Sequence, residues 1–407
     1  RLRTAVARRL ALPLVPQSGK FRGIPSLRAE DTPGTTRSHG RDDMSLDDLR
    51  QRLTAVDAEL VKLIAERQQI VAEVSAHKID TGAPTRDYER EREVLGSVQR
   101  LSVELGLEPD LAADIMRLLI RSSLTHQERR RVAAESTGAG KRALVIGGAG
   151  KMGAWFTDFL ASQEYEVEVA DPSDAGSPFP RVSDWTELGL DHDLIVVAAP
   201  IKATAQILTE LAERKPKGLI LDVGSLKTPL KDSLQRLVST GCRVASIHPM
   251  FGPDTRLLSG RHVIFVDVGV PDATEEARSL FSSTMADRVD MDLEEHDRLI
   301  GYVLGLSHAL NLAFFTALSS SGELVPHLKQ LSSTTFDAQL GVASRVAADN
   351  PHLYYEIQAL NEFGVEPLEA LVRAAEHVRD LIGDRDEQGF VELMERGRSY
   401  LKSSEDL

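Results

Sequence analysis

Three spaced glycines could hold the phosphates of a dinucleotide. Gly148, Gly150 and Gly153 stand in G-x-G-x-x-G spacing after an apolar run at residues 143–146, and residues 155–162 have a helical pattern. In such a unit the glycines make a tight turn, admit a pyrophosphate close to the backbone and bring helix against strand. The helix N-terminus supplies free N–H groups for the phosphates. The spacing predicts a dinucleotide-binding turn, with a plain structural turn as the alternative.

The second strand of this unit, residues 165–170, ends on Asp171. A carboxylate there would accept hydrogen bonds from a ribose 2′-OH and would repel a 2′-phosphate, so NAD is favoured over NADP. We expect the cofactor to be bound by Gly148, Gly150, Lys151, Met152, Gly153, Asp171 and Pro200.

Other reactive side chains follow later strands of the same pattern. Ligands in open α/β sheets bind at the carboxyl ends of the strands, where Pro200, Ser225, Lys227 and His248 stand. Pro249 restricts the backbone of His248 to extended conformations, which helps to fix its direction. His248 is therefore a candidate general base or hydrogen-bond acceptor, with a structural histidine as the alternative. Lys227 has a weaker claim, since most lysines are solvated.

A long helix near the N-terminus carries cations on or beside its apolar stripe. Apolar residues from Leu46 to Val74 recur at alternating three- and four-residue steps, and Arg67 interrupts them. At about 100° per residue, Lys78 lies within about 20° of Arg67, whereas Arg50 points about 100° away. One copy of the helix cannot aim all three cations at one ligand, but a second copy could supply Arg50.

Two further helices place polar groups on stripes that should face the same core. Asp87 and Glu91, with Arg90 beside them, extend the apolar stripe of the second helix, which runs to about residue 105. Ser123 and Gln127 continue the stripe of the third helix. Buried cations need partners. Either Arg67 and Lys78 form salt bridges with Asp87 and Glu91, or the cluster binds an anion.

The order of patterns divides the chain into several parts. Residues 1–43 are basic, rich in Pro and Gly, and expected to be disordered; they are either a targeting peptide or an extension upstream of Met44. Residues 44–135 form the helical domain and 136–140 a linker. Strand-like runs at 194–199, 219–223, 244–247 and 263–268 predict a parallel, doubly wound α/β sheet within residues 141–291.

Residues 292–407 show helical patterns only, including 336–348, 353–363, 367–382 and 387–401. The apolar segment 299–318 contains Ser307, His308 and Asn311, so we expect it to lie in a protein interface and not to span a membrane. Such a helical end commonly closes the cleft of the sheet and forms a dimer. Arg345 either holds an anionic substrate or is an ordinary exposed arginine.

Composition limits the classes of partner and compartment. The formal net charge of −14 argues against nucleic acid or an anionic membrane as the main partner. The single cysteine, Cys242, excludes an intrachain disulfide and a multi-cysteine metal site, and it fits a reducing, cytoplasmic location. No metal site is expected.

Three segments resemble the bifunctional chorismate mutase/prephenate dehydrogenase family of tyrosine biosynthesis. They are Ile64-Ala65-Glu66-Arg67, the run from Arg86 to Glu91, and His248-Pro249-Met250-Phe251-Gly252-Pro253. The resemblance covers nearly all of the chain after Met44. It implies an all-α mutase domain, a Rossmann-like sheet, and an all-α dimerisation domain at the C-terminal end.

For the mutase, the resemblance implies that chorismate's carboxylates are held by Arg67, Arg90, Ser123 and Arg50 of the partner subunit. Lys78 and Gln127 would face the ether oxygen, and Asp87 and Glu91 the hydroxyl end. A Claisen rearrangement needs a compact substrate conformer and positive charge at the breaking C–O bond, with no nucleophile.

For the dehydrogenase, the resemblance implies that His248 accepts a hydrogen bond from the prephenate 4-hydroxyl and that Ser225 orients both groups. Arg345 would bind a carboxylate, and His308 would be a further active-site histidine. Family members with two nearby histidines have the second near Asn311, and a close relative has arginine at Asp337. Tyrosine is a candidate feedback inhibitor. Two alternatives remain. Either the dehydrogenase domain prefers arogenate to prephenate, or the helical domain serves only dimerisation or regulation.

Overall fold

The computed structural model describes residues 45–173 and 176–402, and the expectation for residues 1–43 lies outside these ranges. The chain divides into two compact units at Val61/Lys62, within the long helix α1 (Leu46–Thr81). Ser45 starts α1, because its hydroxyl accepts from the Asp48 N–H while the Asp48 carboxylate accepts from the Ser45 N–H. The helix continues to Thr81, past Lys78.

Two helices complete the described helical domain beyond α1. Asp87 caps α2 (Tyr88–Glu104) by accepting a hydrogen bond from the Arg90 N–H, and Pro109 opens α3 (Pro109–Ala134). These two helices pack against each other. The three-helix pattern expected from the sequence is therefore confirmed.

An eight-stranded sheet follows, in the order β3-β2-β1-β4-β5-β6-β7-β8. Its strands are β1 (Arg142–Ile146), β2 (Glu166–Ala170), β3 (Arg181–Val182), β4 (Leu194–Val197), β5 (Leu219–Asp222), β6 (Val244–Pro249), β7 (His262–Val266) and β8 (Asp287–Met291). The doubly wound sheet is confirmed, but the expectation that all strands run parallel is wrong, since β7 is antiparallel to β6. Residues 250–261 join them without a helix, so the chain returns antiparallel.

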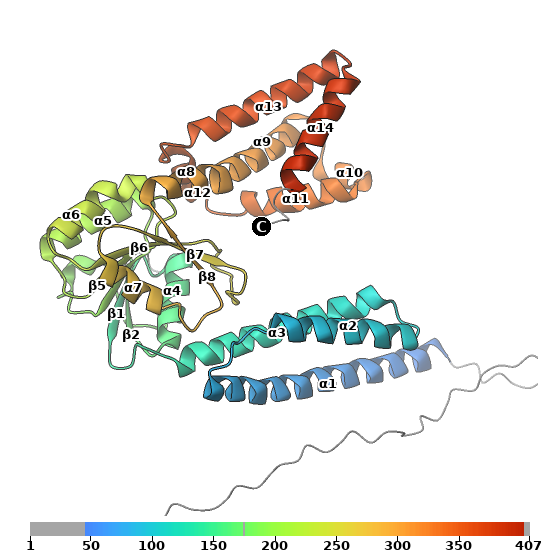
Figure 1. Ribbon diagram of the computed structural model, residues 1–407, viewed down its shortest axis with the longest axis horizontal. Helices are drawn as coiled ribbons and strands as arrows, with labels where there is room; N and C mark the ends of the chain where they lie inside the picture. The colour runs from blue at the N-terminus through green and yellow to red at the C-terminus, as the bar shows by residue number, and fades with distance from the viewer. Residues whose placement is uncertain (1–44, 174–175, 403–407) are drawn as a thin grey trace, which may run out of the picture. The chain divides into compact units, whose positions relative to one another are not determined.

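Helices cover both faces of the sheet (Figure 1). Apolar residues of α4 (Lys151–Ser162) and α7 (Pro271–Ser279) enter one buried core. Those of α5 (Ile201–Arg214) and α6 (Lys231–Ser239) enter the other. The central strands β1, β4, β5, β6 and β7 are almost fully buried between these layers, which explains their continuous apolar sequence.

The C-terminal domain is helical, as expected. It consists of α8 (Leu293–Ile300), a π-helical turn (Gly301–Leu306), α9 (Ser307–Ser320), α10 (Val325–Gln330), α11 (Thr334–Ala347), α12 (Pro351–Ala359), α13 (Val365–Gly383) and α14 (Glu387–Lys402). The continuous stretch Leu293–Ser320 is long and apolar enough to cross a membrane by length and composition, which for one helix is weak evidence. Its burial in a protein interface stays a prediction.

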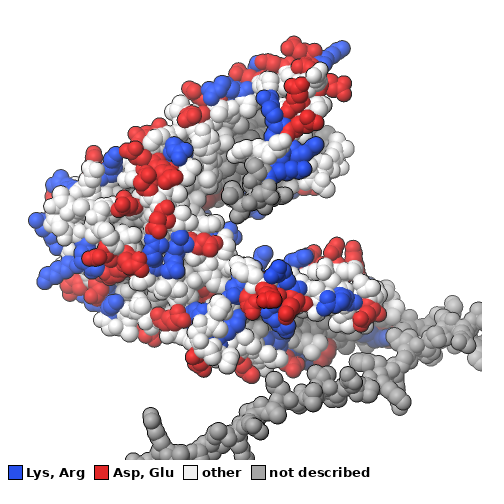
Figure 2. Space-filling view, in the orientation of Figure 1, with Lys and Arg blue, Asp and Glu red and all other residues white. Residues whose placement is uncertain are grey.

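The viewed surface carries Lys and Arg interspersed with Asp and Glu, without one large basic patch (Figure 2). This mixture accords with the formal net charge of −14. A nucleic-acid-binding face of the usual kind would need clustered cations.

Candidate active sites

The first candidate site is a pocket of about 600 Å³ bounded by α1, α2 and α3. Its floor is apolar, with Ile70, Val94 and Met116 among the residues that line it. The predicted site residues that it brings together are Arg67, Lys78, Asp87, Arg90, Glu91, Ser123 and Gln127. Three helices therefore converge on one ligand-sized space.

The two central cations of this pocket are held by neutral groups. Arg67 Nη1 donates to Ser123 Oγ at 2.6 Å and to the Leu119 carbonyl at 3.3 Å. Lys78 Nζ donates to the Thr85 carbonyl at 2.7 Å. Partial burial lowers the pKa of both Arg67 and Lys78. Because both cations donate only to neutral groups, their positive charges are left available to an anion.

The pocket carboxylates have other partners. Glu91 forms a two-pronged ion pair with Arg86, at 2.9 Å for each contact, and Asp87 caps α2. Neither acid forms an ion pair with Arg67 or Lys78, so the alternative of internal pairing is wrong for the described residues. Arg86 was not a predicted site residue, although it belongs to the recognised run 86–91.

Two polar residues of α3 reach the pocket from its buried side. Ser123 and Gln127 are 4% and 8% exposed. The Gln127 Oε1 atom lacks a hydrogen-bond partner within the described part of the chain. A buried amide with unused capacity is suited to a polar ligand.

Arg50 belongs to the compact unit that ends at Val61. Its exposed side chain pairs with Asp47 at 3.3 Å, three residues earlier in α1. Arg50 is absent from the lining of the 600 Å³ pocket.

The second site begins at the glycine-rich turn between β1 and α4. Gly147 has φ of +83°, and a Cβ added at Gly153 would lie 2.1 Å from the Gly147 carbonyl oxygen. Only glycine fits such a close approach. The N-cap of α4, Gly150, has no capping side chain, so the first N–H groups of the helix lack intrahelical acceptors. This turn fits a pyrophosphate.

Asp171 follows β2 and is 8% exposed. Its carboxylate accepts hydrogen bonds from the N–H groups of Ala149 at 3.0 Å and Ser173 at 2.9 Å. The carboxylate is thus tied to the glycine turn, where its remaining capacity can serve ribose hydroxyls. These contacts fit NAD.

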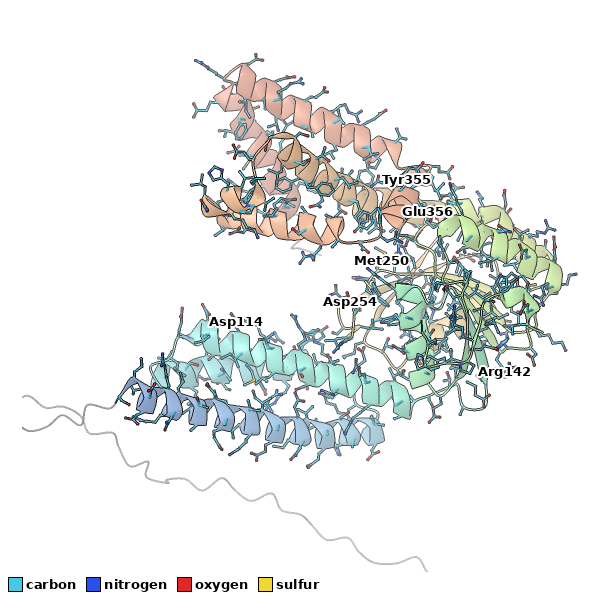
Figure 3. All side chains as sticks on the ribbon, turned by 180° about the vertical axis from the view of Figure 1, so that it is seen from behind. Asp114, Arg142, Met250, Asp254, Tyr355 and Glu356 are labelled. Atoms are coloured by element: carbon cyan, nitrogen blue, oxygen red, sulfur yellow. The ribbon has the colours of Figure 1, made fainter. Side chains whose placement is uncertain are left out.

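The other predicted cofactor residues surround the same edge. Lys151 begins α4, and its ammonium lies 3.6 Å from Asp349. Met152 packs against the core. Pro200 is the N-cap of α5, and the Ile201 N–H after it donates to Glu356 at 2.9 Å. Glu356 lies on α12 (Figure 3).

His248 lies at the end of β6 in a buried chain of hydrogen bonds. Its Nδ1 is 2.9 Å from Nε2 of His296, whose Nδ1 is 2.6 Å from the Asp297 carboxylate. Burial, with the nearby His296 and Lys227, holds the pKa of His248 well below its usual value. Burial also lowers the pKa of His296, although the Asp297 bond opposes this.

This chain of bonds fixes the tautomers. Burial alone would raise the pKa of Asp297, but hydrogen bonds from His296, Thr228 and Lys227 outweigh it and lower the pKa. The Asp297 carboxylate accepts from His296 Nδ1–H, which leaves His296 Nε2 to accept from His248 Nδ1–H. The Nε2 atom of His248 is then a free acceptor. Its chemistry is that of a neutral base.

Lys227 is not the solvated lysine that the sequence favoured. It is fully buried, and its Nζ donates to Asp222 at 2.7 Å and to the Ile247 carbonyl at 2.8 Å. Its own N–H donates to Asp297. Through these hydrogen bonds Lys227 links β5, β6 and α8 next to His248.

The remaining predicted residues lie on separate elements. Ser225 is half-buried after β5, and no hydrogen bond to His248 is formed. His308 of α9 stacks on Tyr354 with ring centroids 4.1 Å apart, and burial lowers its pKa. Arg345 of α11 is exposed and has no ion pair with any described residue.

Sequence reasoning missed His296, Asp297, Asp222 and Glu356. The adjacent pair His296-Asp297 follows the last strand, and such a pair is a usable signal. Nothing in the linear pattern indicated that it would lie against His248. Asn311 is buried, donates to the Ser307 carbonyl and accepts from Gln339, so it has a structural role in this helix pair.

Three family models match consecutive parts of the chain. Residues 49–128 match "Chorismate mutase type II", residues 168–286 match "Prephenate dehydrogenase, nucleotide-binding domain", and residues 292–396 match "Prephenate dehydrogenase, dimerization domain". The three matches follow the helical domain, the sheet and the C-terminal helices.

Two curated relatives and a solved structure are similar to most of this chain. The T-protein of Enterobacter agglomerans is 27% identical over 349 residues, which cover 86% of this chain and 91% of the relative. The T-protein of Haemophilus influenzae is 26% identical over 361 residues, 88% of this chain and 92% of the relative. A solved prephenate dehydrogenase of Aquifex aeolicus, in complex with hydroxyphenyl propionate and NAD+, shares the fold with a TM-score of 0.51. It is 18% identical and covers 66% of this chain and 99% of that one.

The fold and the two sites define an isomerase joined to an NAD-dependent oxidoreductase. More particularly, the chain belongs to the bifunctional chorismate mutase/prephenate dehydrogenases of tyrosine biosynthesis.

Proposed function

We propose that the residues described above carry both reactions of this family: chorismate to prephenate in the pocket of α1–α3, then prephenate to 4-hydroxyphenylpyruvate at His248. The observation that carries the proposal is the convergence of seven predicted residues on one 600 Å³ pocket. Domain boundaries at residues 44–135, 141–291 and 292–407 belong to the same proposal.

In the mutase pocket, Arg67 and Arg90 hold the substrate carboxylates, and Ser123 orients Arg67. The rearrangement breaks one C–O bond and forms one C–C bond within the substrate, so no proton or electron is exchanged. Lys78 and the Gln127 amide donate to the ether oxygen, where negative charge grows in the transition state. Asp87 and Glu91 face the hydroxyl end.

We propose a homodimer in which a second copy supplies Arg50. The first half of α1 leaves large apolar side chains exposed, among them Leu46 at 62%, Leu53 at 62% and Val56 at 56%. Such a face needs cover that the described single chain lacks. The exposed side chains of α9, including Leu310 at 46%, need similar cover.

At the sheet, the glycine turn and Asp171 hold NAD, which when bound accepts a hydride. His248 Nε2 accepts the hydrogen bond of the substrate 4-hydroxyl and draws that proton as hydride leaves the carbon that bears the hydroxyl. The proton returns to this oxygen as the ring becomes aromatic, because the product keeps its hydroxyl. The ring carboxylate departs as CO2, and its bonding electrons complete the aromatic ring. Arg345 and His308 bind the substrate side chain and carboxylate, and Ser225 orients the hydroxyl.

The experiment supplies chorismate and NAD to the purified protein and follows prephenate and NADH. Prephenate formation with later NADH supports both activities. NADH from prephenate but no consumption of chorismate would reduce the helical domain to a dimerisation or regulatory module. Arogenate in place of prephenate tests side-chain preference, and added tyrosine tests feedback inhibition. A cytoplasmic location is part of the proposal and is tested by fractionation.

A further inference from the structure

The connection between β6 and β7, residues 250–261, reaches from the dehydrogenase site to the mutase domain. It starts two residues after His248, and Met250 and Asp254 mark its first part (Figure 3). The Trp155 indole N–H donates to the Thr255 carbonyl at 3.0 Å, which ties this part to α4. Its later part, Leu258 and Ser259, contacts the helical domain.

Glu128 of α3 makes the first of these contacts. One carboxylate oxygen accepts from the Leu258 N–H at 2.8 Å and the other from the Met285 N–H at 2.6 Å. The side chain is 4% exposed, and burial raises its pKa despite these two bonds. A buried carboxylate with both oxygens engaged holds α3 in one position. Gln127, which lines the mutase pocket, is the adjacent residue.

Arg86 makes the second contact. Its Nη1 donates to Ser259 Oγ at 2.7 Å, while Nε and Nη2 pair with both oxygens of Glu91. The guanidinium also lies 4.3 Å from the Tyr88 ring centroid. Ser259 therefore helps to fix the arginine that neutralises a carboxylate of the mutase pocket.

We propose that residues 258–259 of the dehydrogenase position the mutase pocket through Arg86 and Glu128. This inference rests on the proposed mutase function of that pocket. Arg86, Glu128 and Ser259 are positioning residues, because they act through Glu91 and Gln127 and do not themselves touch the substrate. The mutase site is complete only with the connection in place.

The expected consequence is electrostatic. Without its Ser259 bond, Arg86 turns away from Glu91 for part of the time. An uncompensated carboxylate then faces a dicarboxylate substrate and weakens its binding. The mutase KM should rise more than kcat falls, since the charge at the breaking C–O bond comes from Lys78 and Gln127.

The test compares Ser259→Ala, Arg86→Ala and the double variant in the full chain. We expect Ser259→Ala to raise the mutase KM by about fivefold, with kcat within about twofold of wild type. If Ser259 acts through Arg86, the double variant should equal Arg86→Ala alone. Dehydrogenase constants should be unchanged. Ser239→Ala is the matched control, since that exposed hydroxyl bonds only the Arg236 carbonyl of its own helix.

A second arm uses Glu128→Gln, in which one acceptor oxygen becomes an N–H donor that meets a backbone N–H. It should raise the mutase KM, whereas Glu108→Gln, at the exposed start of the same helix, should not. The inference would be overturned if Ser259→Ala and Glu128→Gln both kept the wild-type mutase KM. It would also be overturned if the effects of Arg86→Ala and Ser259→Ala on the mutase KM were additive. Wild-type protein without mutase activity would instead overturn the proposed function.

Discussion

His248 Nδ1 lies 2.9 Å from His296 Nε2, and this distance links the reacting edge of the sheet to α8. Because Asp297 accepts from the far side of His296, His248 donates from Nδ1 and its Nε2 is left unprotonated. Three of the predictions below test this arrangement and the buried charges around it.

The pH profile of the dehydrogenase should show its acid limb below pH 6.5, the ordinary pKa of histidine. The lowered pKa keeps His248 neutral at pH 7, so activity is lost only as pH falls through the folded-state pKa. Kinetics with prephenate and NAD between pH 5 and 8 check this. A limb centred above pH 7 would contradict it.

Asp297→Asn should lower the dehydrogenase kcat on the order of 10²–10⁴-fold, because the amide no longer selects the His296 tautomer. Mutase activity should stay at the wild-type level. Asp292→Asn is the control: Asp292 caps the same helix by accepting from the Glu295 N–H, a role that asparagine fills equally well. Equal kcat values for the two variants would refute the tautomer argument.

Lys227→Met should destabilise the protein by about 3–5 kcal/mol, because it leaves Asp222 as a buried charge without its cation. Urea unfolding measures this change. The double variant Lys227→Met/Asp222→Asn should recover part of the loss. A single variant as stable as wild type would show that the pair contributes little.

Gly153→Ala should raise the KM for NAD at least about tenfold, because its Cβ would lie 2.1 Å from the Gly147 carbonyl oxygen and displace the turn. Gly189→Ala, where an added Cβ meets nothing within 4 Å, serves as control. Steady-state kinetics at saturating prephenate measure the KM for NAD of both variants. Neither substitution should change the mutase activity.

Lys78→Ala should reduce the mutase kcat by about 10²–10³-fold, since it removes a donor aimed at developing negative charge. Lys78→Arg keeps the charge and should retain more activity. Dehydrogenase activity and the unfolding midpoint should match wild type in both. Loss of folding together with activity would assign Lys78 a structural role.

Local sequence determined the elements and much of the first site. Arg67, Lys78, Ser123 and Gln127 fall on helical stripes, so periodicity alone places them on facing surfaces, and the same rule sends Arg50 elsewhere. The glycine spacing and Asp171 likewise predict their turn, because a tight approach admits no side chain. These inferences need only bond geometry and a repeat of about 3.6 residues.

Tertiary structure alone decided which distant groups meet. His296 and Asp297 lie 48 and 49 positions after His248, and only the packing of α8 on the sheet brings His296 against His248, with Asp297 bonded to the far side of His296. Burial of Lys227 depends on Asp222 and on a carbonyl of the neighbouring strand, and β7 reverses direction because its connection has no helix. Hydrogen bonds between remote residues are strongest where the core has excluded water, and no local pattern encodes which residues meet there.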